Sequence, residues 1–232
     1  NGFAHASDVK VIPVTSKIED NFALPSLESF EKKINKRTKA ILICNPCNPT
    51  GYVYSKEEII SIANLAKKND LFIVVDEVYR EFIYTDMKHY SILEDKMFFD
   101  NAILIDSTSK RYSLCGARIG FIVSKNSNFI ETCLKFALAR LSPPTLALIA
   151  ANKALNSDQK YIDGVISEYS HRREVLIDEL SKINDIEFSN PMGAFYSIIK
   201  LPVKNAEDFA KFLLTDFSIN NESVMVAPAS GF

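Results

Sequence analysis

The stretches Ala40-Ile41-Leu42-Ile43-Cys44 and Leu71-Phe72-Ile73-Val74-Val75, with residues 55–68 between them, decide the fold. Both outer stretches are short, wholly apolar and rich in β-branched residues, as expected of buried strands. Between them, Ser55-Lys56-Glu57-Glu58 predicts a capping box that opens an amphipathic helix, whose apolar side consists of Ile59, Ile62, Ala63 and Ala66. Strand, helix and strand with short links predict a βαβ unit. We therefore expect an α/β protein with a mostly parallel sheet flanked by helices.

The segments around this unit extend the prediction. Ala102–Ile105 reads as a further buried strand, and Ile119–Val123 follows so closely that no crossover helix fits, so it should run antiparallel to its neighbour. Helices are expected at 26–34, with Ser26 as N-cap, and at 126–140, 145–156, 158–183 and 205–214, with a break at Pro143-Pro144 and a bend near Gly164. Short strands are expected at 9–14, 186–188, 194–199 and 223–227.

This order of elements divides the chain into two expected domains. Residues 1–157 should form a large α/β domain, and residues 158–232 a connecting helix with an incomplete small α+β domain. The chain has no initiator Met at Asn1 and stops at Phe232 in what reads as a loop. We expect it to be a piece of a longer protein that lacks N- and C-terminal parts.

Composition and charge exclude several classes of protein. Hydrophobic residues make up 47% and charged residues 24%, which is ordinary for a globular protein. A net charge of -2 argues against nucleic acid as the main partner. No apolar run reaches the ~20 residues that cross a bilayer, and no secretory signal precedes the first strand. We expect a cytoplasmic protein that binds neither nucleic acid nor a membrane.

The cysteines are expected to be reduced thiols, because a chain of this size does not need disulfides. Cys44-Asn45-Pro46-Cys47 has the C-x-x-C spacing of a redox pair or half of a zinc site. A zinc site would need two further ligands at matching spacing, and the three histidines are scattered singly. We therefore expect no metal and disfavour a redox pair.

Polar chemistry follows three of the expected strands, at 45–51, 76–79 and 107–118. Because ligands of α/β proteins bind at the carboxyl ends of parallel strands, these segments are candidates for one site. Lys110, among apolar walls and near Arg118, would have its ammonium form disfavoured and its amine available to attack a carbonyl carbon. Ser107, Ser109 and Arg118 could hold a phosphate. Taken alone, the stretch favours the alternative of a surface lysine in a Ser-rich loop beside an unrelated arginine.

Together these segments resemble the fold type I, class I and II aminotransferases, which use pyridoxal 5'-phosphate (PLP). The matching motifs are N-P-x-N-P-T-G at 45–51, D-x-x-Y at 76–79 and S-x-S-K-x(7)-R-x-G at 107–120. Weaker matches are Ser142–Ala147, Arg172-Arg173 and Pro191–Tyr196, so the resemblance covers nearly the whole chain. It implies the large PLP-binding domain of that fold with part of the small C-terminal domain.

The resemblance assigns Lys110 and Asp76 to the chemistry. Lys110 matches the lysine that forms the Schiff base with PLP and then carries a proton between the substrate Cα and the cofactor C4'. Asp76 matches the carboxylate that pairs with the pyridine nitrogen and so keeps the ring an electron acceptor. The alternative for Asp76 is a helix N-cap after a strand.

The resemblance also implies the remaining cofactor contacts. Tyr79 and Asn48 match the residues that meet the PLP 3'-oxygen, and Asn48 also lies near the substrate carboxylate in the family. Ser107, Ser109 and Arg118 match the phosphate cradle. A core tyrosine and a turn asparagine are the alternatives for Tyr79 and Asn48.

Neighbouring residues are given lesser roles. The Asn48-Pro49 bond is expected to be cis, and Gly51 to supply a permissive backbone after it. Arg111 and Lys125 are expected to be solvated. Gly193–Tyr196 is expected to be core of the second domain that faces the cleft.

Some family features are not identifiable in this chain. They are an N-terminal phosphate loop, an aromatic residue stacked on the ring, a tyrosine from a partner subunit and a C-terminal arginine for the substrate carboxylate. We therefore expect this polypeptide to bind PLP poorly or not at all, and the full-length protein to be a homodimer.

The leading functional hypothesis is transfer of an amino group from an L-amino acid, aspartate or aromatic, to a 2-oxo acid by ping-pong chemistry. A PLP-dependent C-S β-lyase or synthase of the same fold shares every motif quoted, and a catalytically inactive fragment of either is a further alternative. A regulatory domain without activity would be expected to lose Lys110, Asp76 or Arg118, and all three are present.

Overall fold

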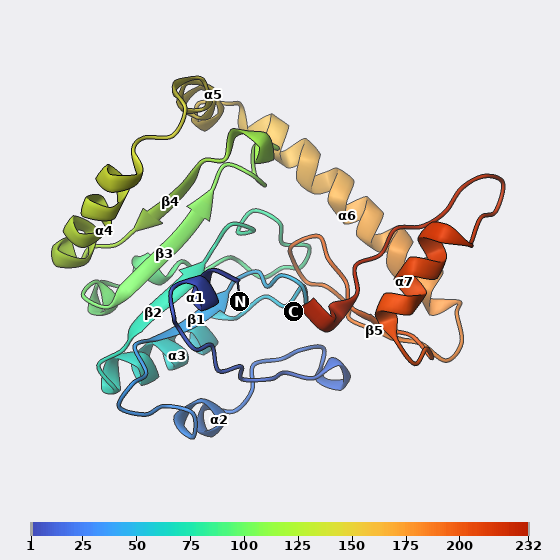
Figure 1. Cartoon of the computed structure of the whole chain (residues 1–232), viewed down its shortest axis with the longest axis horizontal. Helices are drawn as coiled ribbons and strands as arrows, with labels where there is room; N and C mark the ends of the chain where they lie inside the picture. Colours follow the sequence, from blue (N-terminus) through green and yellow to red (C-terminus); the bar gives the residue numbers. More distant parts are fainter. Residues whose placement is uncertain (1, 232) are drawn as a thin grey trace.

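The computed structural model describes residues 2–231, and its centre is a four-stranded sheet (Figure 1). The strands are β1 (Ala40–Cys44), β2 (Phe72–Asp76), β3 (Ala102–Ser107) and β4 (Gly120–Val123), in the spatial order β1-β2-β3-β4. β1, β2 and β3 are parallel, and β4 runs antiparallel to β3. The predicted α/β class, the mostly parallel sheet and the reversed last strand are confirmed.

Helix α3 (Lys56–Lys68) covers one face of the sheet and builds the main core. It begins at the predicted capping box: Ser55 Oγ accepts from the Glu58 N–H at 3.2 Å, and the Glu58 carboxylate accepts from the Ser55 N–H at 2.7 Å. The buried side chains between helix and strands are Ile59, Ile62, Ala63, Leu65, Ala66, Ile41, Ile43, Ile73, Val75 and Leu104. Full burial of one such Ile or Val contributes roughly 1.5–3 kcal/mol, so helix and sheet stabilise each other.

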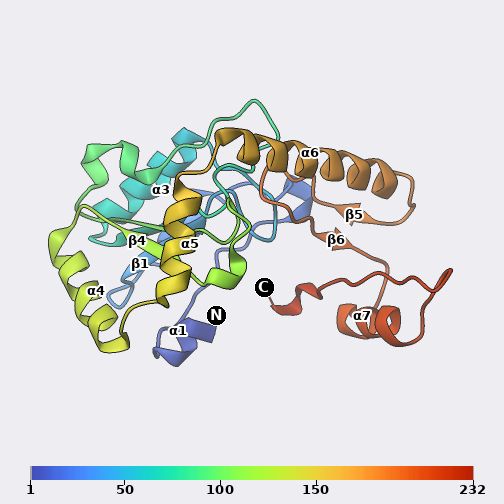
Figure 2. The same ribbon diagram turned by 90° about the horizontal axis from the view of Figure 1, so that it is seen from above.

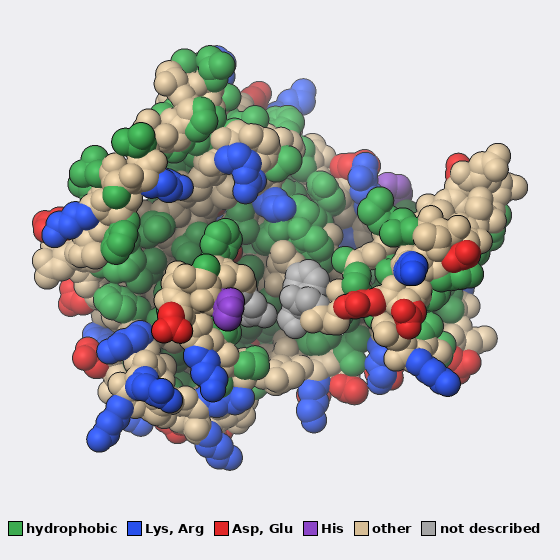
Figure 3. All heavy atoms as spheres, in the orientation of Figure 1, with side chains coloured by type: hydrophobic (Ala, Val, Ile, Leu, Met, Phe, Trp, Pro, Cys, Tyr) green, Lys and Arg blue, Asp and Glu red, His purple; other side chains and the backbone are tan. Residues whose placement is uncertain are grey.

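The opposite face of the sheet is covered less completely. Leu42, next to the buried Ile43, is 68% exposed, and every residue of β4 is exposed. Helix α4 (Ser127–Arg140) has no buried residue, although Phe129 contacts Phe72 with ring centroids 5.6 Å apart. Figure 3 shows apolar side chains on the surface of this side of the molecule. The strand predicted at 40–44 is therefore buried on one face only.

Four of the other helices lie where the sequence pattern predicts them, and they are α2 (Leu27–Glu31), α5 (Thr145–Leu155), α6 (Gln159–Ser181) and α7 (Ala206–Thr215). Helix α1 (Gly2–Ala6) was not predicted. Pro143-Pro144 separates α4 from α5, and α6 continues as one helix through Gly164. Short 3-10 turns are η1 (Ile18–Asp20), η2 (Ile92–Glu94), η3 (Lys96–Phe98), η4 (Cys115–Ala117) and η5 (Ala229–Gly231). Within residues 2–231, no helix is long and apolar enough to cross a membrane.

Helix α6 carries the chain from the sheet to the C-terminal region (Figure 2). There β5 (Glu187–Phe188) pairs antiparallel with β6 (Ile199–Lys200), and α7 follows β6 in the chain. The strand predicted at 194–199 is reduced to its last residue, because residues 189–198 leave the pair as a loop. The division into domains at residue 158 stays a prediction.

Three predicted features are wrong. The segments at 9–14 and 223–227 are irregular, with Val9 58% and Met225 81% exposed. Neither lies beside another strand in the described part of the chain, so neither has the ladder of hydrogen bonds that defines a strand. Ser26 precedes α2 but does not cap it, because its hydroxyl bonds to Ser29 Oγ at 3.1 Å instead of a backbone N–H.

Candidate active site

The carboxyl ends of the parallel strands bring the predicted residues to one edge of the sheet. Cys44 is in register with Asp76, and Asp76 with Ile105, so the three strand ends lie side by side. The pairing continues one step further, where the Asn45 N–H donates to the Asp76 carbonyl at 2.9 Å. Three loops therefore leave the sheet from neighbouring positions, at 45–51, 76–79 and 107–118.

Asp76 ends β2 with its side chain on the face opposite α3, because Val75 beside it points into the core. Its Oδ1 accepts from the Val78 N–H at 3.1 Å in a turn, so it caps no helix. Burial, reinforced by Asp106 and Glu77, raises the pKa of the Asp76 carboxyl. Among residues 2–231, Asp76 has no ion-pair partner within 4.0 Å.

Lys110 lies beside the faces of two aromatic rings. Its Nζ is 5.6 Å from the centre of the Tyr79 ring and 5.5 Å from that of Phe195. A lysine ammonium at this distance is attracted to the negative face of a ring. In the described residues no carboxylate lies within ion-pair distance of Lys110. Within the described residues its amine is thus held by the two ring faces rather than by a counter-ion.

Tyr79 is buried, with 2% of its surface exposed. Its hydroxyl lies 2.8 Å from that of Tyr196, 117 residues further along the chain. Burial, together with this hydrogen bond, raises the pKa of the Tyr79 hydroxyl, so it is a phenol and not a phenolate at neutral pH. The hydroxyl can therefore donate a hydrogen bond to a bound group.

The residues predicted to hold a phosphate lie at the end of β3 and in the loop that leads to β4. Ser107 is in register with Gly120, and its Oγ lies 2.8 Å from both Ser109 Oγ and the Ile119 carbonyl oxygen. Arg118, at φ 57°, is exposed and donates through Nη1 to the Cys115 carbonyl at 2.9 Å. The structure thus brings the hydroxyls of Ser107 and Ser109 together, and Arg118 lies at the other end of the same loop with further guanidinium donors that an anion could use.

The backbone of the loop that contains Asn48 is shaped by two proline bonds and by Gly51. Both Asn45-Pro46 and Asn48-Pro49 are cis, so the expectation for the second bond is confirmed and the first bond was missed. Asn48 itself is exposed at the same sheet edge. Gly51 has φ +73°, and a Cβ there would lie 2.3 Å from Pro191 Cβ. Glycine is therefore required twice over at this position.

Comparison with known proteins identifies the family. A family model described as aminotransferase class I and II matches residues 2–230. The chain belongs to that family. An aspartate aminotransferase of Pyrococcus abyssi is 33% identical over 228 residues, which cover 96% of this chain and 57% of that protein.

Solved aminotransferase structures share the fold. An aromatic aminotransferase of Pyrococcus horikoshii matches with a TM-score of 0.80 at 31% identity, over 88% of this chain and 56% of that one. An alanine aminotransferase of Pyrococcus furiosus matches with a TM-score of 0.81 at 29% identity, over 92% and 56%. The chain spans about half the length of the curated relatives it matches.

Arg111, which follows the candidate lysine, is not solvated as predicted. It is 7% exposed, and its Nη2 donates to Asp106 Oδ2 at 2.9 Å. Its Nε lies 3.0 Å from Glu81 Oε1, and Arg80 Nε is also 3.0 Å from that oxygen. The missed signal was Asp106, a carboxylate at the end of an apolar strand, which needs a cation if it is buried. Lys125 is exposed, as expected.

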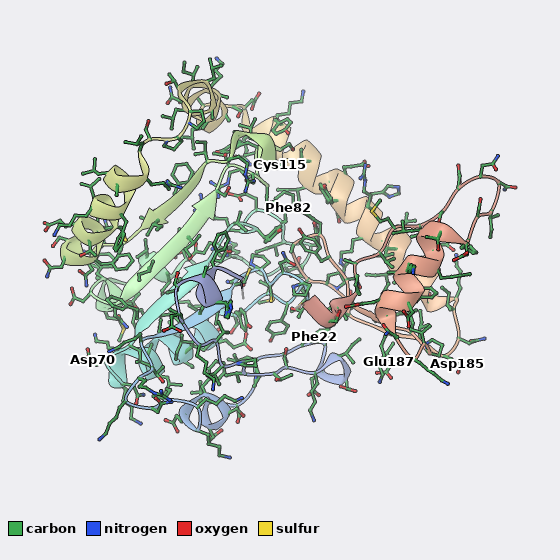
Figure 4. The ribbon with its side chains drawn as sticks, viewed as in Figure 1. Phe22, Asp70, Phe82, Cys115, Asp185 and Glu187 are labelled. Atoms are coloured by element: carbon green, nitrogen blue, oxygen red, sulfur yellow. The ribbon has the colours of Figure 1, made fainter. Side chains whose placement is uncertain are left out.

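The aromatic residues of the C-terminal part complete the surroundings of the lysine. Phe195 packs against Tyr79, Phe82 and Tyr169, with ring centroids 5.1, 5.2 and 4.7 Å away. Figure 4 labels Phe82, between the sheet edge and α6. The segment predicted as core facing the cleft therefore reaches the candidate site itself, and Tyr196 is a site neighbour that the sequence did not single out.

Cys44 lies close to the site but is not a reactive thiol. Burial raises the pKa of Cys44 to about 12, and its Sγ donates to the Pro46 carbonyl at 3.2 Å. The thiol is therefore neutral at physiological pH, whereas a thiolate is the form that binds metals and attacks disulfides.

Members of the family use PLP, and the residues at this edge fit that group. Asp76 is a partly buried carboxylate with no cation beside it among residues 2–231, which suits a protonated ring nitrogen. Lys110 is an amine with no counter-ion in the described part of the chain, which suits an aldehyde. The hydroxyls of Ser107 and Ser109, with Arg118, suit a phosphate.

Proposed function

We propose that the protein is a PLP-dependent aminotransferase that moves an amino group from an L-amino acid, aspartate or aromatic, to a 2-oxo acid. One observation carries the proposal: Lys110 and Asp76 come to one sheet edge, both beside Tyr79, and neither has an oppositely charged side chain within 4.0 Å in residues 2–231. The names of the relatives, aspartate and aromatic aminotransferases, support the substrate class.

Each residue has a separate role in the proposal. Lys110 holds the cofactor through its amine and, once released, moves a proton at the substrate Cα. Asp76 orients the cofactor through its ring nitrogen and keeps that nitrogen protonated. Bound PLP supplies an electron-accepting ring.

The remaining contacts fix the position of the cofactor. Tyr79 donates its hydroxyl proton to the ring oxygen, with Asn48 as second donor and as a contact of the substrate carboxylate. Ser107, Ser109 and Arg118 bind the phosphate. Both ends of the cofactor are then held, so the bond to be broken at the substrate can be oriented.

Borohydride trapping tests this assignment even if PLP binds weakly. The chain is incubated with PLP at millimolar concentration and reduced, and the lysines that carry the reduced cofactor are identified by peptide mass spectrometry. We expect Lys110 to be labelled in preference to Lys125, an exposed lysine that lies over the ring of Phe99. Asp76→Asn should lower the labelling of Lys110 and leave that of Lys125 unchanged. Equal labelling of both lysines would refute the proposal.

The reaction type needs a second assay. Amino-group transfer from aspartate or phenylalanine to 2-oxoglutarate is measured beside pyruvate release from cystathionine. Transfer without pyruvate release is expected of an aminotransferase, and the reverse result would identify a C-S β-lyase.

A further inference from the structure

The segment Pro191–Tyr196 is fixed against the two loops that flank the candidate lysine. The N–H groups of Met192 and Gly193 donate to the Gly51 carbonyl at 2.8 and 2.9 Å. The Ala194 N–H donates to the Phe82 carbonyl at 2.9 Å. Gly193 is enclosed so tightly that a Cβ there would lie 2.7 Å from the Phe82 oxygen. These contacts therefore fix the positions of the next two residues, Phe195 and Tyr196.

Both residues lie beside Tyr79. The ring of Tyr196 meets that of Tyr79 edge to face, with centroids 5.7 Å apart and an angle of 88°. Their hydroxyl oxygens are 2.8 Å apart, and this is the one side-chain hydrogen bond of Tyr79 within residues 2–231. Among the residues that the structure describes, Tyr196 is therefore the side chain that orients the Tyr79 hydroxyl.

The direction of this hydrogen bond decides what Tyr79 can do. A phenol hydroxyl has one proton to donate and two lone pairs that accept. If Tyr79 donates to Tyr196, its proton is used and it can only accept from a ligand. If Tyr196 donates to Tyr79, the Tyr79 proton stays available for an oxygen of the ligand, and the incoming hydrogen bond polarises that O–H.

We propose that Tyr196 is a positioning residue whose hydroxyl donates a hydrogen bond to Tyr79 Oη. The Tyr79 O–H is thereby left to donate its own hydrogen bond to the ring oxygen of the cofactor. The inference rests on the proposed function, in which Tyr79 meets that oxygen. It assigns a part of the site to the C-terminal region, which otherwise packs apart from the sheet.

Tyr196→Phe removes only the hydroxyl, and Tyr169→Phe is its matched control. Tyr169 belongs to the same aromatic cluster and stacks on Phe195 at 4.7 Å, but its hydroxyl has no hydrogen bond to the described residues. The concentration of PLP that gives half-maximal trapping on Lys110 should rise about 3- to 10-fold in Tyr196→Phe, as for the loss of one hydrogen bond. It should stay unchanged in Tyr169→Phe.

A double substitution distinguishes action through Tyr79 from a general loss of structure. In a Tyr79→Phe background, Tyr196→Phe should have no further effect on half-maximal trapping. The pH at which the visible absorbance of bound PLP changes should shift in the same direction in both single variants. An equal loss in both backgrounds, or no loss in Tyr196→Phe, would overturn the proposal.

A measurement without cofactor separates this inference from the proposed function. With 13C at Cζ of every tyrosine, the Tyr79 resonance is assigned by its disappearance in Tyr79→Phe. It should move in Tyr196→Phe and keep its position in Tyr169→Phe. A Tyr79 resonance that does not move in Tyr196→Phe would refute the hydrogen bond. A chain that takes no PLP on Lys110 at millimolar concentration would refute PLP binding by this chain and with it the cofactor role of Tyr196 here, while the resonance still decides the contact.

Discussion

Replacing Arg111 by Met removes one of two cations from a compact ion-pair network. The network consists of Arg80, Glu81, Asp106 and Arg111. The side chains of Arg111 and Asp106 are 8% and 10% exposed and that of Glu81 is 20% exposed, so water screens them poorly. After the substitution Arg80 is the one cation of this network left for two carboxylates within residues 2–231, at 3.0 Å from Glu81 and 3.7 Å from Asp106.

The cost follows from this geometry. Removing one member of a buried ion pair costs about 3–5 kcal/mol, and partial compensation by Arg80 reduces the expected loss for Arg111→Met to about 2–3 kcal/mol. With a urea dependence of about 2–3 kcal/mol per M, the midpoint of unfolding should fall by about 1 M. Arg111→Lys keeps the charge but not the planar fork, so its midpoint should lie between those of Arg111→Met and the unsubstituted chain.

Urea unfolding followed by circular dichroism measures these differences. The matched control is Arg172→Met, which breaks an exposed pair with Glu168 at 2.8 Å on α6. Such an exposed pair is screened by water and contributes little to stability, so the control midpoint should barely move. If Arg111→Met and Arg172→Met shifted the midpoint equally, the buried network would not stabilise the loop that carries the lysine.

Three other substitutions or modifications test single features. Gly51→Ala should lower the free energy of unfolding by about 2–4 kcal/mol, because alanine is strained at the positive φ of this position and its Cβ would lie 2.3 Å from Pro191 Cβ. Gly164→Ala, in open space within a helix, should raise the free energy of unfolding by about 0.5–1 kcal/mol. Similar urea midpoints for these two variants would contradict this. Burial raises the pKa of Asp76, so the ionised carboxylate costs stability in the folded chain. Asp76→Asn should therefore be more stable than the unsubstituted chain at pH 7, and the difference should vanish as the pH falls below 3.8, the ordinary value; a less stable variant at pH 7 would exclude this cost. Iodoacetamide at pH 8 should alkylate the exposed Cys115 at least about tenfold faster than Cys44, whose pKa is about 12, and equal rates by mass spectrometry would refute the burial argument.

The elements predicted correctly are those whose signals are local. The capping box at Ser55 and the apolar runs of β1, β2 and β3 specify the βαβ unit within 40 consecutive residues or so. The strand predicted at 9–14 failed because a strand needs a neighbour, and the pattern of apolar residues carries no information about whether one is present. The same holds for 223–227 at the other end.

The predictions of the site residues also differ according to whether the signal is local in the sequence. Lys110, Asp76 and Tyr79 were found because each directly follows an apolar strand, and parallel strands bring their ends together. Arg111 was misjudged, and Tyr196 was predicted only as core facing the cleft, because their partners are distant in the sequence: Glu81 lies on another loop, and Tyr79 is 117 residues from Tyr196. Only the folded chain shows that the arginine is buried and that the tyrosine reaches the site.

Charges at the sheet edge fall into two sets that differ in compensation. Arg80, Glu81, Asp106 and Arg111 neutralise one another, and this network anchors the loop without leaving a net field. Asp76 and Lys110 have no such partners among the described residues. A partly buried carboxylate without a cation lowers the stability of the chain, and a ligand that brings a cation to it recovers that cost on binding. Saturating PLP should therefore raise the urea midpoint of the unsubstituted chain more than that of Asp76→Asn. The variant that is more stable alone should then gain less from the cofactor, and equal gains would show that Asp76 does not face the ring nitrogen.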